Sequence, residues 1–150
     1  KMFEMVDGQP FNADKAYKDS KLCNVFFTRE LQRRLAGAKS EITVNCFTPG
    51  LIVSSGLFRE QPKLFTKVFD VAATNVLKVG ESQEWGGACL VHTTTVDTKG
   101  LFYSSPPGSS KYGLEAVGNQ LVPTDPSKES QDGAKGVRLW DLSEKLVGIA

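Results

Sequence analysis

The sequence contains a single histidine, His92, and only three cysteines. With only one imidazole, the chain has almost none of the histidines that His-dependent catalytic triads and His-rich metal centres require. The cysteines, Cys23, Cys46 and Cys89, are odd in number and lack Cys-x-x-Cys spacing. That pattern argues against a disulfide framework or a zinc site and favours a reducing compartment. We therefore expect no metal site.

An excess of charge and long apolar runs are missing as well. The formal net charge is +1 at pH 7, so no basic stripe is available to neutralise phosphates and no nucleic-acid partner is expected. No apolar run approaches the roughly 20 residues needed to span a bilayer. The chain opens Lys1-Met2-Phe3 without a signal or transit pattern. A trimmed precursor and a start inside a larger protein both fit this opening.

Hydrophobic periodicity and turn residues predict four helices and two short strands. The predicted helices span 16–35, 57–79 with a break near Pro62, 81–95 and 130–147, and the predicted strands span 41–47 and 100–105. Asn12 or Asp14 is expected to cap the first helix, and Ser82 the third. Residues 106–127 are rich in Pro, Gly and Ser and predict an exposed loop excursion.

The order of these elements predicts an α/β protein with parallel strands, organised as one domain over residues 1–150. Two strands are too few for a complete parallel sheet, because each strand needs neighbours and helices on both faces. The chain is therefore expected to form about half of a domain. A partner that covers the open sheet edge, either a missing N-terminal half or another subunit, is expected as well.

Tyr17 and Lys21 lie one helical turn apart in the first predicted helix, on a polar face shared with Asn24 and Thr28. A lysine ammonium near a phenol favours phenolate and lowers the pKa of the tyrosine from its reference of about 10. Such a tyrosine can donate a proton to an atom that receives hydride. The alternative is that both are ordinary surface residues of a helix.

The residues after this helix favour the chemical interpretation. A strand follows and ends in Thr48-Pro49-Gly50, and Ser54 lies four residues beyond the glycine. This combination resembles the second half of the short-chain dehydrogenase/reductase family. Within it, the stretches "KAYKDSKLCN", "GLFRE" (56–60) and "LWDLSEKLVGIA" (139–150) are similar to the light-dependent protochlorophyllide oxidoreductases, which reduce one double bond of a chlorophyll precursor with NADPH and light.

The resemblance implies a fold and roles for individual residues. The fold would be the C-terminal half of a Rossmann-type doubly wound parallel sheet, without the N-terminal nucleotide-binding half. Tyr17 would be the catalytic proton donor, and Lys21 would hold the nicotinamide ribose and bias the tyrosine. The nicotinamide side of the NADPH site would be lined by Pro49, Gly50, Ile52 and Ser54. The location would be the chloroplast, in the stroma or peripheral at the thylakoid surface.

Two departures from the family pattern bear on activity. The family usually carries a cysteine immediately after Pro-Gly, close to the pigment, where this chain has Leu51. The family's Gly-rich phosphate-binding turn is also missing from these residues, so this chain is not expected to hold NADPH alone in the usual way.

Two functions stay open on this pattern. One is an NADPH-dependent reductase that acts on a tetrapyrrole pigment. The other is a non-catalytic subunit, derived from a reductase, that binds within a larger photosynthetic pigment–protein assembly.

Other conspicuous residues receive structural interpretations. Trp85 and Trp140 are expected to anchor packing. Arg33-Arg34 is expected to be a solvated helix end, and Gly86-Gly87 a soft spot in the third helix. Cys23 is expected to pack, Cys46 and Cys89 to be small buried hydrophobic residues, and His92 to be a helix residue with a local hydrogen bond.

Overall fold

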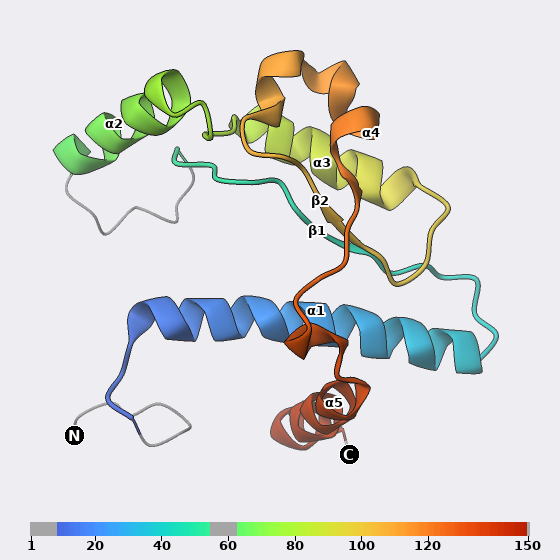
Figure 1. Cartoon of the computed structure of the whole chain (residues 1–150). Coiled ribbons are helices and arrows are strands. Elements are labelled where there is room, and N and C mark those ends of the chain that lie inside the picture. The colour runs from blue at the N-terminus through green and yellow to red at the C-terminus, as the bar shows by residue number, and fades with distance from the viewer. Residues whose placement is uncertain (1–8, 55–62, 150) are drawn as a thin grey trace. The chain divides into compact units, whose positions relative to one another are not determined.

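The computed structural model describes residues 9–54 and 63–149. The chain divides into two compact units, the first made of Lys1–Val44 with Pro126–Ala150 and the second of Asn45–Asp125. Figure 1 shows the helices and strands that each unit contains.

The first unit is built on two helices that cross and pack against one another (Figure 1). Its elements are α1 (Ala13–Gly37), the 3-10 helix η5 (Glu129–Gln131) and α5 (Gly133–Val147). Asn12 caps α1 by accepting a hydrogen bond from the Lys15 N–H at 2.9 Å, as predicted. Asp132 caps α5 in the same way, and Gly148, with a φ of 74°, ends it.

The second unit contains a small sheet with helices around it. Its strands are β1 (Cys46–Thr48), β2 (Phe102–Ser104) and β3 (Val122–Pro123), and its helices are α2 (Lys63–Val71), the π-helix η2 (Ala72–Val76), α3 (Gln83–Thr95), the 3-10 helices η3 (Ser109–Tyr112) and η4 (Leu114–Ala116), and α4 (Val117–Gln120). β1 and β2 run parallel and β3 joins β2 antiparallel, in the order β1-β2-β3. The predicted α/β class with a parallel pair is confirmed; the antiparallel third strand was not predicted.

The first strand is shorter than predicted, because the residues before it use side chains for hydrogen bonding. The Val44 N–H donates to Oε1 of Gln32 at 2.7 Å instead of joining a ladder. Asn45 then binds the carbonyl of Thr98 and the N–H of Leu101 through its amide. Regular pairing begins at Cys46, opposite Phe102.

The core of the second unit forms where α3 packs against the sheet. Its fully buried members are Trp85, Cys89, Tyr103 and Leu121. α3 runs unbroken through Gly86 and Gly87, so the predicted soft spot is wrong. The reason is close packing: a Cβ at Gly86 would lie 2.7 Å from Cδ1 of Ile52. The missing side chain lets the helix approach this neighbour.

Residues 106–127 are more ordered than their composition indicates. Most are exposed or half-buried, but the segment holds η3, η4, α4 and strand β3. Ser109 and Leu121 are buried at 1% exposure each, and Leu121 belongs to the core. The glycines and serines correctly indicate turns in this segment, but the turns connect short helices instead of forming one open loop.

Candidate functional site

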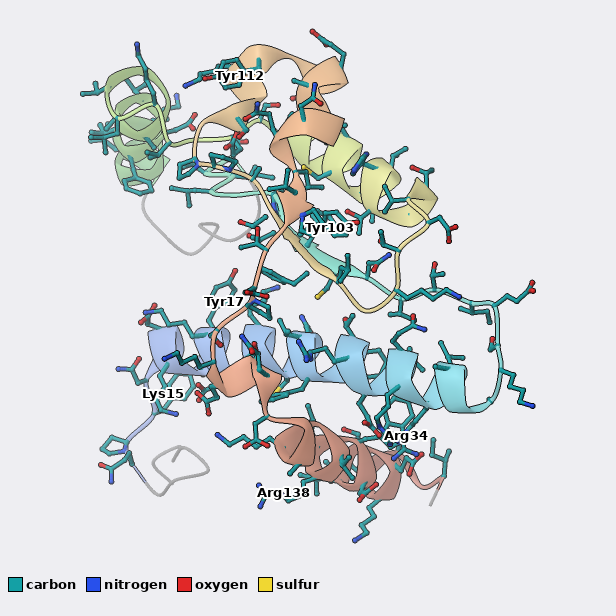
Figure 2. The ribbon with its side chains drawn as sticks, turned by 45° about the vertical axis from the view of Figure 1, so that its right-hand side comes forward. Lys15, Tyr17, Arg34, Tyr103, Tyr112 and Arg138 are labelled. Atoms are coloured by element: carbon teal, nitrogen blue, oxygen red, sulfur yellow. The ribbon has the colours of Figure 1, made fainter. Side chains whose placement is uncertain are left out.

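Tyr17 and Lys21 lie together on α1, as their spacing predicts. The Lys21 Nζ is 5.4 Å from the centroid of the Tyr17 ring, over the ring face rather than beside the hydroxyl. Tyr17 is 43% exposed, and Figure 2 shows it projecting from α1. Among the described residues, no hydrogen bond is made by the Tyr17 hydroxyl or the Lys21 ammonium. Both polar groups are therefore available to a ligand.

The Pro49–Gly50 turn follows β1 in the second unit. Gly50 has a φ of +92°, a conformation that L side chains rarely adopt. A Cβ there would also lie 2.8 Å from Cγ of Glu81. Both constraints select glycine at this position without reference to a ligand.

The residues after the turn are fixed by the segment that leads into α3. Leu51 forms an isolated parallel bridge with Gly80, and its carbonyl accepts from the Glu81 N–H at 2.8 Å. Ile52 is half-buried against Gly86. The Ser54 carbonyl accepts from Nε2 of Gln83 at 2.7 Å. The exposed Ser54 hydroxyl has no protein partner in the described part of the chain and can serve a ligand.

Glu81 is a buried residue that no sequence pattern indicates as functional. It is 6% exposed, and its two carboxylate oxygens accept from the N–H groups of Ser109 and Ser110 at 2.9 and 2.8 Å. Burying a carboxylate is costly unless hydrogen bonds compensate. In the sequence, Glu81 stands just before the Ser82 cap of a helix, and that position does not indicate hydrogen-bond partners 28 and 29 residues later.

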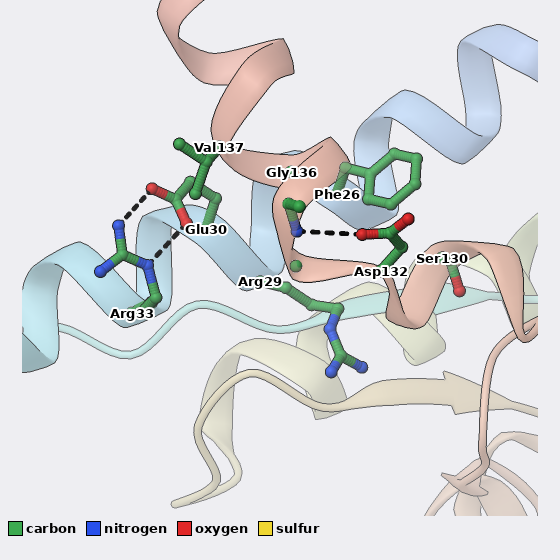
Figure 3. Close-up of a pocket in the computed structure, with 10 residues that line it drawn as sticks. Phe26, Arg29, Glu30, Arg33, Ser130, Asp132, Gly136 and Val137 are labelled. Carbon is green, nitrogen blue, oxygen red and sulfur yellow. Dashed lines mark hydrogen bonds and ion pairs between the residues drawn. The ribbon is translucent and has the colours of Figure 1, made fainter.

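A second charged cluster lies between α1 and α5, beside a cavity of about 530 Å³. Oε1 and Oε2 of Glu30 accept from Arg33 at 2.6 and 2.7 Å, and Arg34 donates to Oε1 at 2.7 Å (Figure 3 shows the Arg33 contacts). These bonds, led by Arg33 and opposed by burial, lower the pKa of Glu30 from 4.5 to about 2. Arg34 also lies 4.6 Å from the Trp140 ring centroid. The predicted solvated helix end therefore holds for Arg33, which is 63% exposed, but not for Arg34, which is 35% exposed and packs on the Trp140 ring.

The cysteines differ from one another in their surroundings. Cys89 is buried and Cys46 half-buried, whereas Cys23 is exposed and lines a small pocket with Trp140. Burial, reinforced by the nearby charge of Glu81, raises the pKa of the Cys89 thiol to about 11, which disfavours the reactive thiolate. Across residues 9–54 and 63–149, no cluster of His, Cys, Asp or Glu could hold a metal ion. The stretch "GLFRE" lies outside the described residues.

Comparison with known proteins gives the geometry a context. No family model matches the chain. It is 36% identical over 149 residues to protochlorophyllide reductase B, chloroplastic, of Oryza sativa subsp. japonica, and 36% identical over 149 residues to protochlorophyllide reductase, chloroplastic, of Pisum sativum. Each alignment covers 97% of this chain. The chain is similar to protochlorophyllide reductases along almost its whole length.

This similarity confirms the predicted resemblance for the part of each relative that the chain spans. The chain spans 34% of the Oryza relative and 35% of the Pisum relative, about a third of each. A crystal structure of an uncharacterized protein from Mycobacterium Paratuberculosis matches with a TM-score of 0.56 over 92% of this chain and 40% of that chain, at 23% identity. That likeness supports the partial Rossmann-type fold alone.

The names of the relatives also bear on location. They are called chloroplastic, which supports the predicted chloroplast location; the choice between stroma and thylakoid surface stays a prediction. No helix within the described residues is long and apolar enough to cross a membrane.

Proposed function

We propose that this chain is the Tyr-Lys-bearing part of an NADPH-dependent reductase that acts on a tetrapyrrole, as the protochlorophyllide reductases it resembles are named for doing. The observation that carries the proposal is the Tyr17–Lys21 pair on α1, within a chain 36% identical to those relatives. The hydroxyl and the ammonium both lack protein hydrogen-bond partners among the described residues, so both can face a ligand.

Residues of each unit, taken separately, carry groups that a nicotinamide nucleotide would need. NADPH, when bound, supplies the hydride. The Lys21 ammonium would hold the nucleotide by donating to its ribose hydroxyls. Tyr17 donates its hydroxyl proton to the carbon next to the one that receives hydride, so that one double bond gains two hydrogens. On the nicotinamide side, the turn Pro49–Gly50 and Ile52 give a fixed backbone, and the Ser54 hydroxyl can donate to a carboxamide oxygen.

The test is Tyr17→Phe in the full polypeptide that carries this sequence, assayed with NADPH, protochlorophyllide and light. Loss of a general acid lowers kcat by about 100-fold or more, while the melting temperature stays unchanged because Tyr17 is 43% exposed. Tyr112→Phe is the matched control, since that tyrosine is also exposed and carries Lys111 Nζ 4.7 Å from its ring centroid. Unaltered turnover in Tyr17→Phe would contradict the proposal.

A second function is favoured by one residue, Leu51. It stands where the family resemblance implies a cysteine, and an aliphatic side chain can neither donate a proton nor make a polar contact to a pigment. A reductase-derived subunit that binds within a pigment–protein assembly would tolerate this change. That function predicts stable association with a larger assembly and no affinity for NADPH. Tight NADPH binding by the full polypeptide would count against it.

A further inference from the structure

Glu81 lies between two turns that are far apart in sequence. Its Cγ is 2.8 Å from where a Gly50 Cβ would stand, and its N–H donates to the Leu51 carbonyl at 2.8 Å. Both its backbone and its side chain therefore contact the turn after β1. Gly50, with a φ of +92°, leaves the space that the Glu81 side chain fills.

The carboxylate of Glu81 holds the second turn. It accepts from two consecutive N–H groups, those of Ser109 and Ser110, at the start of η3. This turn also approaches the segment before Glu81, because a Cβ at Gly108 would lie 2.0 Å from the Lys78 carbonyl oxygen. Figure 1 shows the segment that leads into η3 beside the start of α3.

No cation shares this position with Glu81 in the part of the chain that the structure describes. The charge of a carboxylate that is 6% exposed is therefore stabilised mainly by the two backbone N–H groups. Such charge-assisted hydrogen bonds are shorter and stronger than neutral ones. Moving the Ser109–Ser110 turn would leave the carboxylate unsatisfied. If Glu81 moved with that turn, the bond from its own N–H to the Leu51 carbonyl would be lost, so the residue couples the two turns.

We infer that Glu81 is a positioning residue that holds the Pro49–Gly50–Leu51 turn in register with the Ser109–Ser110 turn. The inference rests on the proposed function for its consequence: if the first turn lines the nicotinamide, Glu81 sets the position of that lining without touching the cofactor. Loss of Glu81 then weakens NADPH binding while the chemical step, which Tyr17 performs, changes little.

The experiment compares Glu81→Gln with Glu84→Gln in the full polypeptide. Glu84 is an exposed carboxylate in the first turn of α3, three residues after Glu81, so it is a matched control. Hydrogen–deuterium exchange is measured for the amides of Ser109, Ser110 and position 81, and the NADPH Kd and kcat are measured in parallel. Glu81→Gln should speed exchange at all three amides by about tenfold or more and raise Kd by about tenfold, with kcat within about twofold. Glu84→Gln should change none of these.

The exchange data decide the inference independently of the cofactor. Faster exchange at Ser109 and Ser110 with no change at position 81 would overturn it, because the two turns would not be coupled. An unchanged NADPH Kd in Glu81→Gln, beside a wild type that binds NADPH, would overturn it too. A wild type that does not bind NADPH would refute the proposed function, whereas exchange would still decide the coupling.

A second variant, Gly50→Ala, covers the case in which Glu81→Gln does not fold. Its new Cβ would lie 2.8 Å from Cγ and 3.2 Å from Oε1 of Glu81, so the Glu81 side chain would have to move. Faster exchange at Ser109 and Ser110, nearly 60 residues away in sequence, is expected only if Glu81 transmits the displacement. Unchanged exchange there would overturn the inference.

Discussion

Phe27 of α1 and Trp140 of α5 stack with ring centroids 5.6 Å apart and ring planes 11° from parallel. Arg34 lies at the same indole, 4.6 Å from its centroid, and reaches Asp141 at 3.4 Å. Aromatic pairs and cation–π contacts add energy beyond the area that they bury. The Trp140 ring therefore anchors the pair of helices in the first unit.

Trp140→Ala should lower the free energy of unfolding by about 2–3 kcal/mol, because the stack, the Arg34 contact and the buried ring area are lost together. The measurement is urea denaturation followed by circular dichroism. Leu146→Ala on the same helix is the control, since Leu146 is 77% exposed and should change stability by less than about 0.5 kcal/mol. Equal effects of the two substitutions would contradict the anchoring role.

Glu30 should make the first unit sensitive to acid. Its pKa is lowered from 4.5 to about 2, so the ionised form contributes stability that is fully present above about pH 4.5 and is lost as the pH falls toward 2. In Glu30→Gln this pH-dependent part should disappear, leaving a protein that is less stable at pH 7 but loses less stability between pH 5 and pH 3. Denaturation curves at pH 7, 5 and 3 measure it.

Asp14→Asn is the control for that titration. Asp14 pairs with Lys18 at 2.7 Å, but the two side chains are 73% and 70% exposed, and exposed pairs contribute little. An acid response that is the same in Glu30→Gln and in the wild type would show that Glu30 is not the titrating group.

Local patterns predicted what depends on local physics. The Asn12 and Ser82 caps and the Tyr17–Lys21 proximity follow from helix geometry and side-chain chemistry, and all three are present. The parallel pair was also predictable, since the short strands alternate with helices.

The features missed are pairings between distant residues. Glu81 meets Ser109 after 28 residues, and Tyr103 meets Pro123 after 20. Arg34 looked like a solvated helix end because its partner Asp141 lies 107 residues later. No spacing in the sequence marks such partners, because only the folded chain brings them together.

Lys21→Met should separate the two roles assigned to that lysine. Methionine keeps the length of the side chain and helix propensity but removes the ammonium that lies over the Tyr17 ring. The NADPH Kd should rise and kcat should fall, each by about tenfold or more, with the melting temperature unchanged. Lys18→Met is the control in the same assay, since Lys18 lies three residues before Lys21 on α1 and is 70% exposed. A loss confined to kcat would show that Lys21 does not hold the nucleotide.

Cysteine accessibility should differ sharply within the folded protein. At pH 8, iodoacetamide should modify Cys23, which is exposed, and leave Cys89 unmodified, since burial and the Glu81 charge raise the pKa of Cys89 to about 11 and so suppress its thiolate. In denaturant both should react, as peptide mass spectrometry can show. Modification of Cys89 at a rate similar to that of Cys23 before unfolding would contradict the packed α3 core.

Leu51→Cys tests whether the residue after Pro-Gly limits the chemistry. The substitution puts back a polar, protonatable group at the position where the family resemblance implies one. The backbone contacts of Leu51 with Gly80 and Glu81 are independent of its side chain, so the turn should be preserved. Light-dependent reduction of protochlorophyllide should rise by about tenfold or more, while Leu51→Ala, which shortens the side chain without adding a thiol, should give no gain. Equal rates for the two variants would show that the Leu51 side chain limits access of the pigment rather than the chemical step. A wild-type rate as high as that of Leu51→Cys would show that this chain supplies the missing group from elsewhere.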